Sequence, residues 1–145
     1  MSERVISNII EGRPLISCNK ESTVRAACKL MTSKKISALA VLDKDKLVGI
    51  FTERDALSKV LAGGLDPDKT AISEVMVADP QTVRAAMPLA YALHVMFEGG
   101  FRHVPIVDDE GAPIGMVSAR DALGEDLVRL ERELDRMETL VHPMS

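Results

Sequence analysis

The chain alternates between apolar runs of strand length and segments with helical spacing. Two nearly continuous apolar runs, residues 38–42 and 104–107, each meet a short polar turn and then a second apolar run, residues 47–51 and 113–117. Two strands split by so tight a turn form a hairpin. The pattern therefore predicts two β-hairpins, one in each half of the chain.

A helix is predicted ahead of each hairpin. The first begins at Ser22, a favourable N-cap, and ends near Ser33, with apolar residues at helical spacing between them. The second follows Pro88, which fits a first helical turn, and ends at Gly99 and Gly100. A further helix is predicted after each hairpin, from Thr52 and from Ser118. The order of elements is thus the same in both halves.

The two halves also repeat each other residue by residue. Residues 54–57 read Arg-Asp-Ala-Leu and recur as residues 120–123, a shift of 66 positions that aligns the halves without a gap. An internal repeat of this kind indicates units that bury a shared face. We predict an α+β fold of two tandem βαββα repeats, residues 1–63 and 72–124, with a linker at 64–71 and pseudo-twofold symmetry.

Residues 125–145 continue the last helix past the end of the repeat. Its apolar residues alternate at spacings of four and three, the a/d pattern of a helix seam: Leu123, Leu127, Leu130, Leu134, Met137 and Val141. The seam could pack on its own domain or against a helix of another molecule, and the sequence leaves both open.

Composition narrows the class of protein. The chain is 46% hydrophobic and carries a net charge of -4, with only 3% aromatic residues. We therefore expect a folded protein, and nucleic acid is an unlikely partner because a basic face and stacking platforms are missing. There is no leader pattern or membrane-length apolar run, so we expect a cytoplasmic protein that does not engage a membrane. Cys18 and Cys28 form no metal or disulfide motif and are expected to be reduced.

The sequence shows few residues in an arrangement that catalysis would need. Its histidines, His94, His103 and His142, are not spaced with one another or with Cys or carboxylates as metal ligands would be. Neither of the usual glycine-rich phosphate loops occurs. We therefore predict no catalytic residue, no metal, no catalytic cofactor and no enzyme activity.

One polar motif occurs in both halves, where a strand turns into a helix. It reads Gly-x-x-Thr/Ser-x-x-Asp and begins at Gly49 and at Gly115. The hydroxyl and carboxylate alone could form a helix capping box. They could also receive the ribose and phosphate oxygens of a nucleotide at an electropositive helix start, with a neighbouring arginine. The residues concerned are Thr52, Arg54 and Asp55 in the first half, and Ser118, Arg120 and Asp121 in the second.

In these residues the chain resembles the CBS domain, present as a tandem pair (a Bateman module). The resemblance is carried by residues 15–17, 73–76, 81–83 and 103–108 together with the two Gly-x-x-Thr/Ser-x-x-Asp segments. It covers nearly the whole chain, and the order and constant spacing of the motifs make it specific.

The resemblance implies a regulatory module that senses an adenine nucleotide, such as AMP, ADP, ATP or NAD(H), or the related S-adenosylmethionine. It also implies a homodimer, and a nucleotide-driven change in geometry read by an effector protein in trans. The alternative is a ligand-free interaction or dimerisation module. The family's ribose-binding pairs fall on Thr52 with Asp55 and Ser118 with Asp121. Contacts to the rest of the nucleoside would fall on Ser17, Ser37, Ala38, Leu39, Thr82, His103, Val104 and Pro105.

Overall fold

The computed structural model describes residues 4–141, with the side chains of residues 125–128 and 139–141 left out. The first half of the chain forms α1 (Ile6–Ile10), β1 (Ser17–Asn19), α2 (Val24–Lys34), β2 (Ala38–Asp43), β3 (Lys46–Thr52), α3 (Glu53–Asp55) and the continuing helical turns η1 (Ala56–Leu61). The second forms η2 (Ile72–Glu74), β4 (Val77–Ala78), β5 (Val83–Arg84), α4 (Leu89–Gly99), β6 (His103–Val107), β7 (Pro113–Ser118), η3 (Ala119–Ala122) and α5 (Gly124–Val141). The predicted α+β fold of two βαββα repeats is confirmed.

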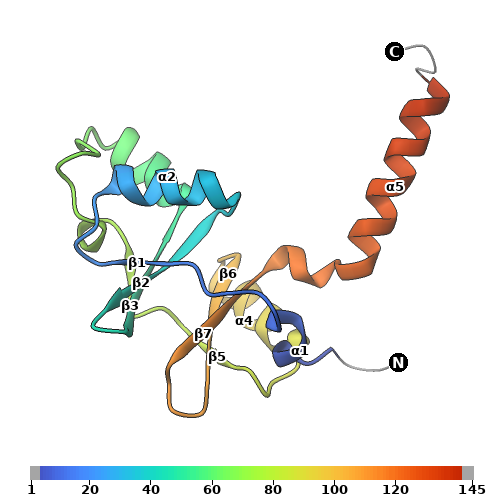
Figure 1. Ribbon diagram of the computed structural model, residues 1–145, viewed down its shortest axis with the longest axis horizontal. Coiled ribbons are helices and arrows are strands. Elements are labelled where there is room, and N and C mark those ends of the chain that lie inside the picture. Colours follow the sequence, from blue (N-terminus) through green and yellow to red (C-terminus); the bar gives the residue numbers. More distant parts are fainter. Residues whose placement is uncertain (1–3, 142–145) are drawn as a thin grey trace.

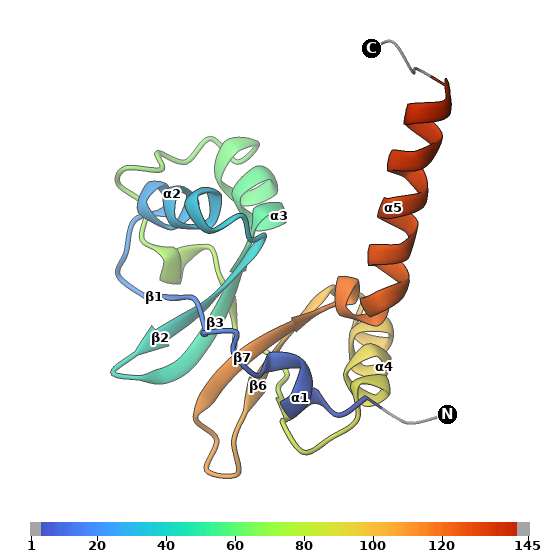
Figure 2. The same cartoon turned by 45° about the vertical axis from the view of Figure 1, so that its right-hand side comes forward.

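Each repeat is built on its own sheet. The first has the strand order β1-β2-β3-β4 and the second β5-β6-β7. Within each, a short strand runs parallel to the first hairpin strand, and the hairpin strands are antiparallel. Helices α2 and α3 cover the first sheet, and α1 and α4 lie against the second (Figures 1 and 2).

The two lobes exchange their leading segments. Ile6 and Ile10 of α1 are buried in the core of the second lobe with Leu89 and Val104. Conversely, Ile72 is buried in the core of the first lobe. In Figure 1 the blue α1 accordingly lies among the yellow and orange elements.

Backbone hydrogen bonds fix this exchange. The Ile6 N–H donates to the Met87 carbonyl at 3.0 Å, and the Ile72 N–H donates to the Ser22 carbonyl at 2.8 Å. Each lobe therefore cannot complete its core without the other half of the chain, which ties the lobes into one folding unit.

Two local predictions are wrong. The N-cap of α2 is Thr23 rather than Ser22, because the Thr23 hydroxyl accepts the Ala26 N–H at 3.1 Å. The last helix is not continuous from Ser118: a turn of 3₁₀ helix ends at Ala122, and α5 starts at Gly124. Gly124 has φ +45°, in the left-handed region that favours glycine, and Arg4 occupies the space that a side chain there would need.

Helix α5 projects away from both lobes (Figure 2). The seam residues whose side chains are described are exposed, with Leu130 at 50%, Leu134 at 59% and Met137 at 58%. Leu127 and Val141 lie outside the described side chains. The described part of the seam is therefore not covered by its own domain. None of the helices in the described range is both long and apolar enough to cross a membrane.

Candidate functional site

A cavity of about 420 Å³ lies where the two repeats meet. The first repeat lines it with a loop, the end of α2 and the start of β2, and the second with the start of β6, the end of β7 and the turn after β7. The lining residues are Gly12, Arg13, Pro14, Leu15, Ile16, Lys34, Lys35, Ile36, Ser37 and Ala38 from the first repeat, and His103, Met116, Ser118, Arg120 and Asp121 from the second.

Asp121 is the most heavily engaged group in this cavity. Its Oδ2 accepts the Ser118 N–H at 2.9 Å, which is the capping contact that the sequence predicts. Arg13 binds the same carboxylate in a bidentate manner, at 2.8 Å from Oδ1 and 3.2 Å from Oδ2. The guanidinium also donates to the Met116 carbonyl at 2.9 Å.

These contacts hold Asp121 in its charged form. Burial opposes ionisation, but the hydrogen bonds from Arg13 and Ser118 and the charges of Arg13 and Arg4 outweigh it, so the pKa of Asp121 lies below its usual value. The carboxylate is thus available as an acceptor near neutral pH.

Ser37 and His103 meet at the boundary between the repeats. The Ser37 hydroxyl and His103 Nε2 share a hydrogen bond of 3.0 Å, and His103 faces Ser118 in the strand register. Burial lowers the pKa of His103 below its usual value, which favours the neutral imidazole. The cavity therefore offers a neutral polar group beside a charged carboxylate.

The equivalent residues of the first repeat form a tighter cluster. Asp55 is buried, and its Oδ2 accepts the Thr52 N–H at 3.0 Å and the Thr52 hydroxyl at 3.1 Å. Its Oδ1 pairs with Lys59 Nζ at 3.1 Å, and Lys59 also donates to the Val75 carbonyl at 2.9 Å. Thr52 and Asp55 therefore form the full capping box, with a cation from the next turn of the same helix.

The glycines of the two motifs have a separate role. A Cβ on Gly49 would collide with the Met76 side chain and meet the Val77 carbonyl at 3.0 Å. A Cβ on Gly115 would meet Ile10 atoms at 3.1–3.2 Å. Both neighbours belong to exchanged segments, so these glycines admit the leading segment of the opposite repeat. Capping alone did not explain them.

The structure brings six of the residues that the sequence singled out to this cavity: Ser37, Ala38, His103, Ser118, Arg120 and Asp121. The others lie apart from its lining. Leu39, Val104 and Pro105 have fully buried side chains. Ser17 lies in β1 beside the lining residue Ile16, and Thr82 and Arg54 are exposed. Thr52 and Asp55 form the capping cluster of the first repeat.

Sequence reasoning missed three cations of the cavity, Arg13, Lys34 and Lys35. The shift of 66 positions places Asp79, Gly100 and Phe101 opposite them, so they have no counterpart in the repeat. A search for residues shared by both halves passes over them. The useful signal would have been basic residues that lie next to the repeated motifs but do not themselves repeat.

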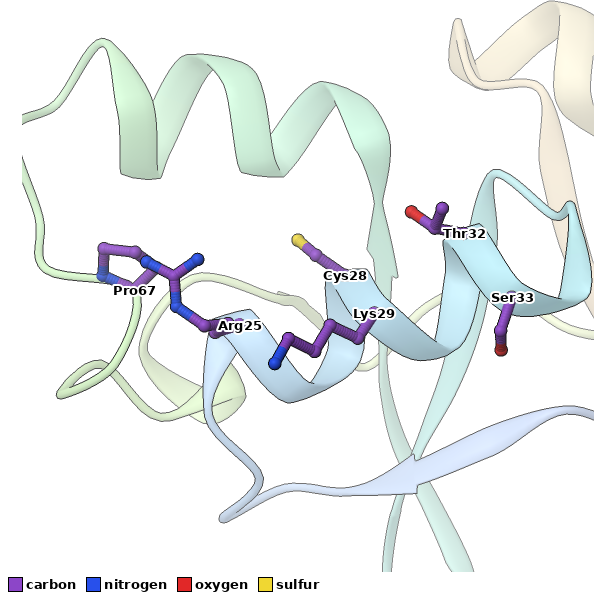
Figure 3. A pocket seen from close by; sticks show the side chains of 6 residues that line it. All are labelled: Arg25, Cys28, Lys29, Thr32, Ser33 and Pro67. Carbon is purple, nitrogen blue, oxygen red and sulfur yellow. The ribbon is translucent and has the colours of Figure 1, made fainter.

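A second hollow, of about 400 Å³, lies between α2 and the 63–69 segment. Figure 3 shows Arg25, Cys28 and Thr32 on the side of α2 that faces Pro67. Arg25 pairs there with Asp68. All its lining residues come from α2 and the 63–69 segment, so the second repeat contributes none of them. Among the described residues, no cluster of His, Cys, Asp and Glu could hold a metal ion.

The fold and the cavity define a class before any comparison. Two βαββα lobes exchange their leading segments and have a polar, partly cationic cavity between them, which defines a tandem-repeat α+β module. The CBS domain family model matches residues 6–62 and 72–127. The chain belongs to the CBS-domain family, and the pair forms a regulatory module.

Relatives agree with this assignment. A CBS domain-containing protein of Arabidopsis thaliana is 35% identical over 113 residues, which are 77% of this chain but 21% of that protein. This chain therefore spans about a fifth of that relative's length. Among solved structures, a protein with CBS domains from Burkholderia ambifaria has TM-score 0.78 and 30% identity, covering 86% of this chain and 94% of that one.

A second solved structure carries a ligand. It is a CBS domain protein of Pyrobaculum aerophilum complexed with AMP, with TM-score 0.77 and 25% identity, covering 88% of this chain and 96% of that one.

Proposed function

We propose that this protein senses an adenine nucleotide, which it binds in the cavity between the repeats. The observation that carries the proposal is the cavity itself, because one side brings Ser118 and Asp121 and the other brings Ser37 and Ala38. Its volume of about 420 Å³ falls within the usual range of small-molecule sites, about 300–1,000 Å³. The AMP complex of the Pyrobaculum relative supports the same ligand class.

The residues present suit each part of such a ligand. The Asp121 carboxylate can accept the two ribose hydroxyls, since a carboxylate has about four acceptor positions. The backbone around Ser37 and Ala38 can face the base, and Arg120 and the neighbouring lysines can face phosphate. The Asp55 cluster, closed by Thr52 and Lys59, is the weaker candidate site.

Binding would be converted into a signal through the two-lobed architecture. A ligand that contacts both repeats favours the lobe arrangement that it fits best, and only this difference in affinity can shift the equilibrium. Exposed apolar side chains on η1, α4 and α5 favour a homodimer: Leu57, Leu61, Phe97, Leu130 and Leu134. An effector protein would then respond to the ligand-dependent change in lobe arrangement. Catalysis has no part in this scheme.

Calorimetry with protein freed of co-purified nucleotide tests the proposal. AMP, ADP, ATP, NAD, NADH and S-adenosylmethionine are titrated separately into the wild type, Asp121→Ala and Asp55→Ala. Saturable binding of at least one ligand that is lost in Asp121→Ala and kept in Asp55→Ala is the expected result. A folded wild type that gives no heat with any of them contradicts it.

One observation favours a second function. Helix α5 projects away from both lobes, and its described seam residues are apolar and exposed. An interaction module that works through this helix with an empty cavity would have such a surface. Ligand-dependent stabilisation in a thermal unfolding assay would exclude it.

A further inference from the structure

Two other groups cover the carboxylate of Asp121. Two of the acceptor positions of this carboxylate are taken by the Arg13 guanidinium and a third by the Ser118 N–H. The Ser118 bond is part of the helix cap. The Arg13 bonds come instead from 108 residues away in the chain. A ribose that binds Asp121 must therefore compete with Arg13 for the same oxygens.

Arg13 is placed to move. Its side chain is 44% exposed, and the hydrogen bonds that hold it, to Asp121 and to the Met116 carbonyl, all reach the second repeat. It follows Gly12, whose φ of +75° marks a turn rather than a regular element. Releasing the guanidinium breaks no helix or strand hydrogen bond.

Charge then decides what can replace the contact. A released guanidinium needs an anionic partner, and it binds phosphate in the same bidentate manner as carboxylate. Lys34, Lys35 and Arg120 line the same cavity, so the released group would join three further cations. The phosphate of a nucleotide supplies such an anion, whereas adenosine carries none, and S-adenosylmethionine carries one carboxylate together with two positive groups.

We infer that Arg13 is a specificity-determining residue that pairs with Asp121 until a nucleotide binds and then transfers to the ligand's phosphate. The inference rests on the proposed function and narrows it to phosphorylated adenine nucleosides. Exchange of one bidentate partner for another lets AMP, ADP and ATP enter at little net cost. Adenosine must leave the arginine without an anionic partner.

This exchange of arginine partners is possible in one repeat only. The residue equivalent to Arg13 is Asp79, and those equivalent to Lys34 and Lys35 are Gly100 and Phe101. The cation on Asp55 is Lys59 from the same helix, held in addition by the Val75 carbonyl. The Asp55 cluster therefore offers no comparable exchange, and the site is expected to be asymmetric.

Calorimetry on Arg13→Gln, Arg13→Lys and the wild type tests the inference, with AMP, adenosine and S-adenosylmethionine as the ligands. Arg25→Gln is the matched control, because it removes another exposed arginine–aspartate pair, with Asp68, away from the cavity. The wild type and the control should bind AMP at least about tenfold more tightly than adenosine, the effect of one hydrogen bond to a charged group.

In Arg13→Gln that ratio should fall about tenfold, with AMP weakened and adenosine unchanged or strengthened, because the carboxylate is uncovered. Arg13→Lys should be intermediate, since it keeps the charge without the bidentate geometry. An AMP-to-adenosine ratio that is unchanged in Arg13→Gln, or that falls equally in Arg25→Gln, overturns the inference while leaving the proposed function standing. A wild type that binds none of the ligands overturns both.

Discussion

Ser37 and His103 occupy the same position of the two repeats, 66 residues apart, and their side chains share a hydrogen bond of 3.0 Å. Two equivalent residues can touch in this way only where the two halves meet, so the contact marks the pseudo-twofold axis. His103 and Ser37 also line the cavity. The boundary between the lobes is therefore a polar, titratable contact beside the proposed ligand.

The first prediction concerns this contact and pH. Burial lowers the pKa of His103, while Glu53 and Asp121 raise it and Arg102 lowers it. A folded-state pKa below the unfolded value of about 6.5 means that the stabilisation is complete above pH 6.5 and is lost as the pH falls through the folded pKa.

The unfolding free energy, measured by urea denaturation between pH 7.5 and 5, should fall less steeply in His103→Gln than in the wild type. His94→Gln, on the exposed side of α4, should follow the wild type; equal slopes in all three proteins would refute the prediction.

The second prediction concerns the charge state of Asp121. Its lowered pKa means that the Arg13 pair stabilises the fold above about pH 4 and stops doing so as the pH falls through the folded pKa. Arg13→Gln should raise the Asp121 pKa, because burial then acts with less opposition. The cost at pH 7 should be below about 1 kcal/mol, since Arg13 is 44% exposed and solvent screens the pair. Carboxyl carbon NMR titration measures the first quantity and urea unfolding the second; an unmoved Asp121 pKa contradicts the account.

A third prediction follows from the exchanged segments. Gly49→Ala should destabilise the protein by about 1–3 kcal/mol, the usual cost of overpacking, because the Val77 backbone cannot withdraw as a flexible side chain can. Gly115→Ala should cost less, since Ile10 needs to give by only a few tenths of an ångström. Thermal unfolding of both variants decides the order, and a more damaging Gly115→Ala would show that the motif glycines have another purpose.

The fourth prediction addresses the seam of α5 as a contact between two copies of the chain. Leu130→Asp with Leu134→Asp should lower the association constant and move the sedimentation coefficient toward that of the monomer. Arg132→Asp adds the same side chain off the seam and should sediment like the wild type. A double variant that sediments like the wild type would show that the seam of α5 does not join two copies of the chain.

The fifth prediction concerns the two thiols. Burial raises the pKa of Cys18 to about 11. Burial also raises that of Cys28, which Arg25 partly offsets. Since the thiolate is the reactive form, iodoacetamide at pH 8 should label Cys28 before Cys18, as followed by peptide mass spectrometry. Preferential labelling of Cys18 would show that β1 opens far more readily than its packing implies.

Much of the fold could be predicted because its signals are local. The apolar runs at 38–42 and 104–107 form β2 and β6, and the glycine pair at the end of α4 provides the left-handed C-cap at Gly100. The exchange of Ile6 and Ile72 between cores could not be predicted, because both residues are apolar at the same repeat position and either pairing buries them equally well. The break before Gly124 was missed because the heptad spacing of apolar residues continues through it, although the helical backbone is interrupted there.

The candidate site divides in the same way. Asp121 and Ser118 could be found because they repeat, and repetition is visible in one sequence. Arg13 could not, because its importance comes from a contact 108 residues away and its equivalent position holds Asp79. Residues that break a symmetric pattern carry the differences between the two halves, and only the folded chain shows where those differences meet.

A crystal structure of the protein grown with AMP tests the central claim most directly. The account predicts AMP in the cavity between the repeats, with its ribose on the Asp121 carboxylate and Arg13 moved to the phosphate. AMP on the Asp55 cluster, or an Arg13–Asp121 pair that stays closed beside bound AMP, would contradict it.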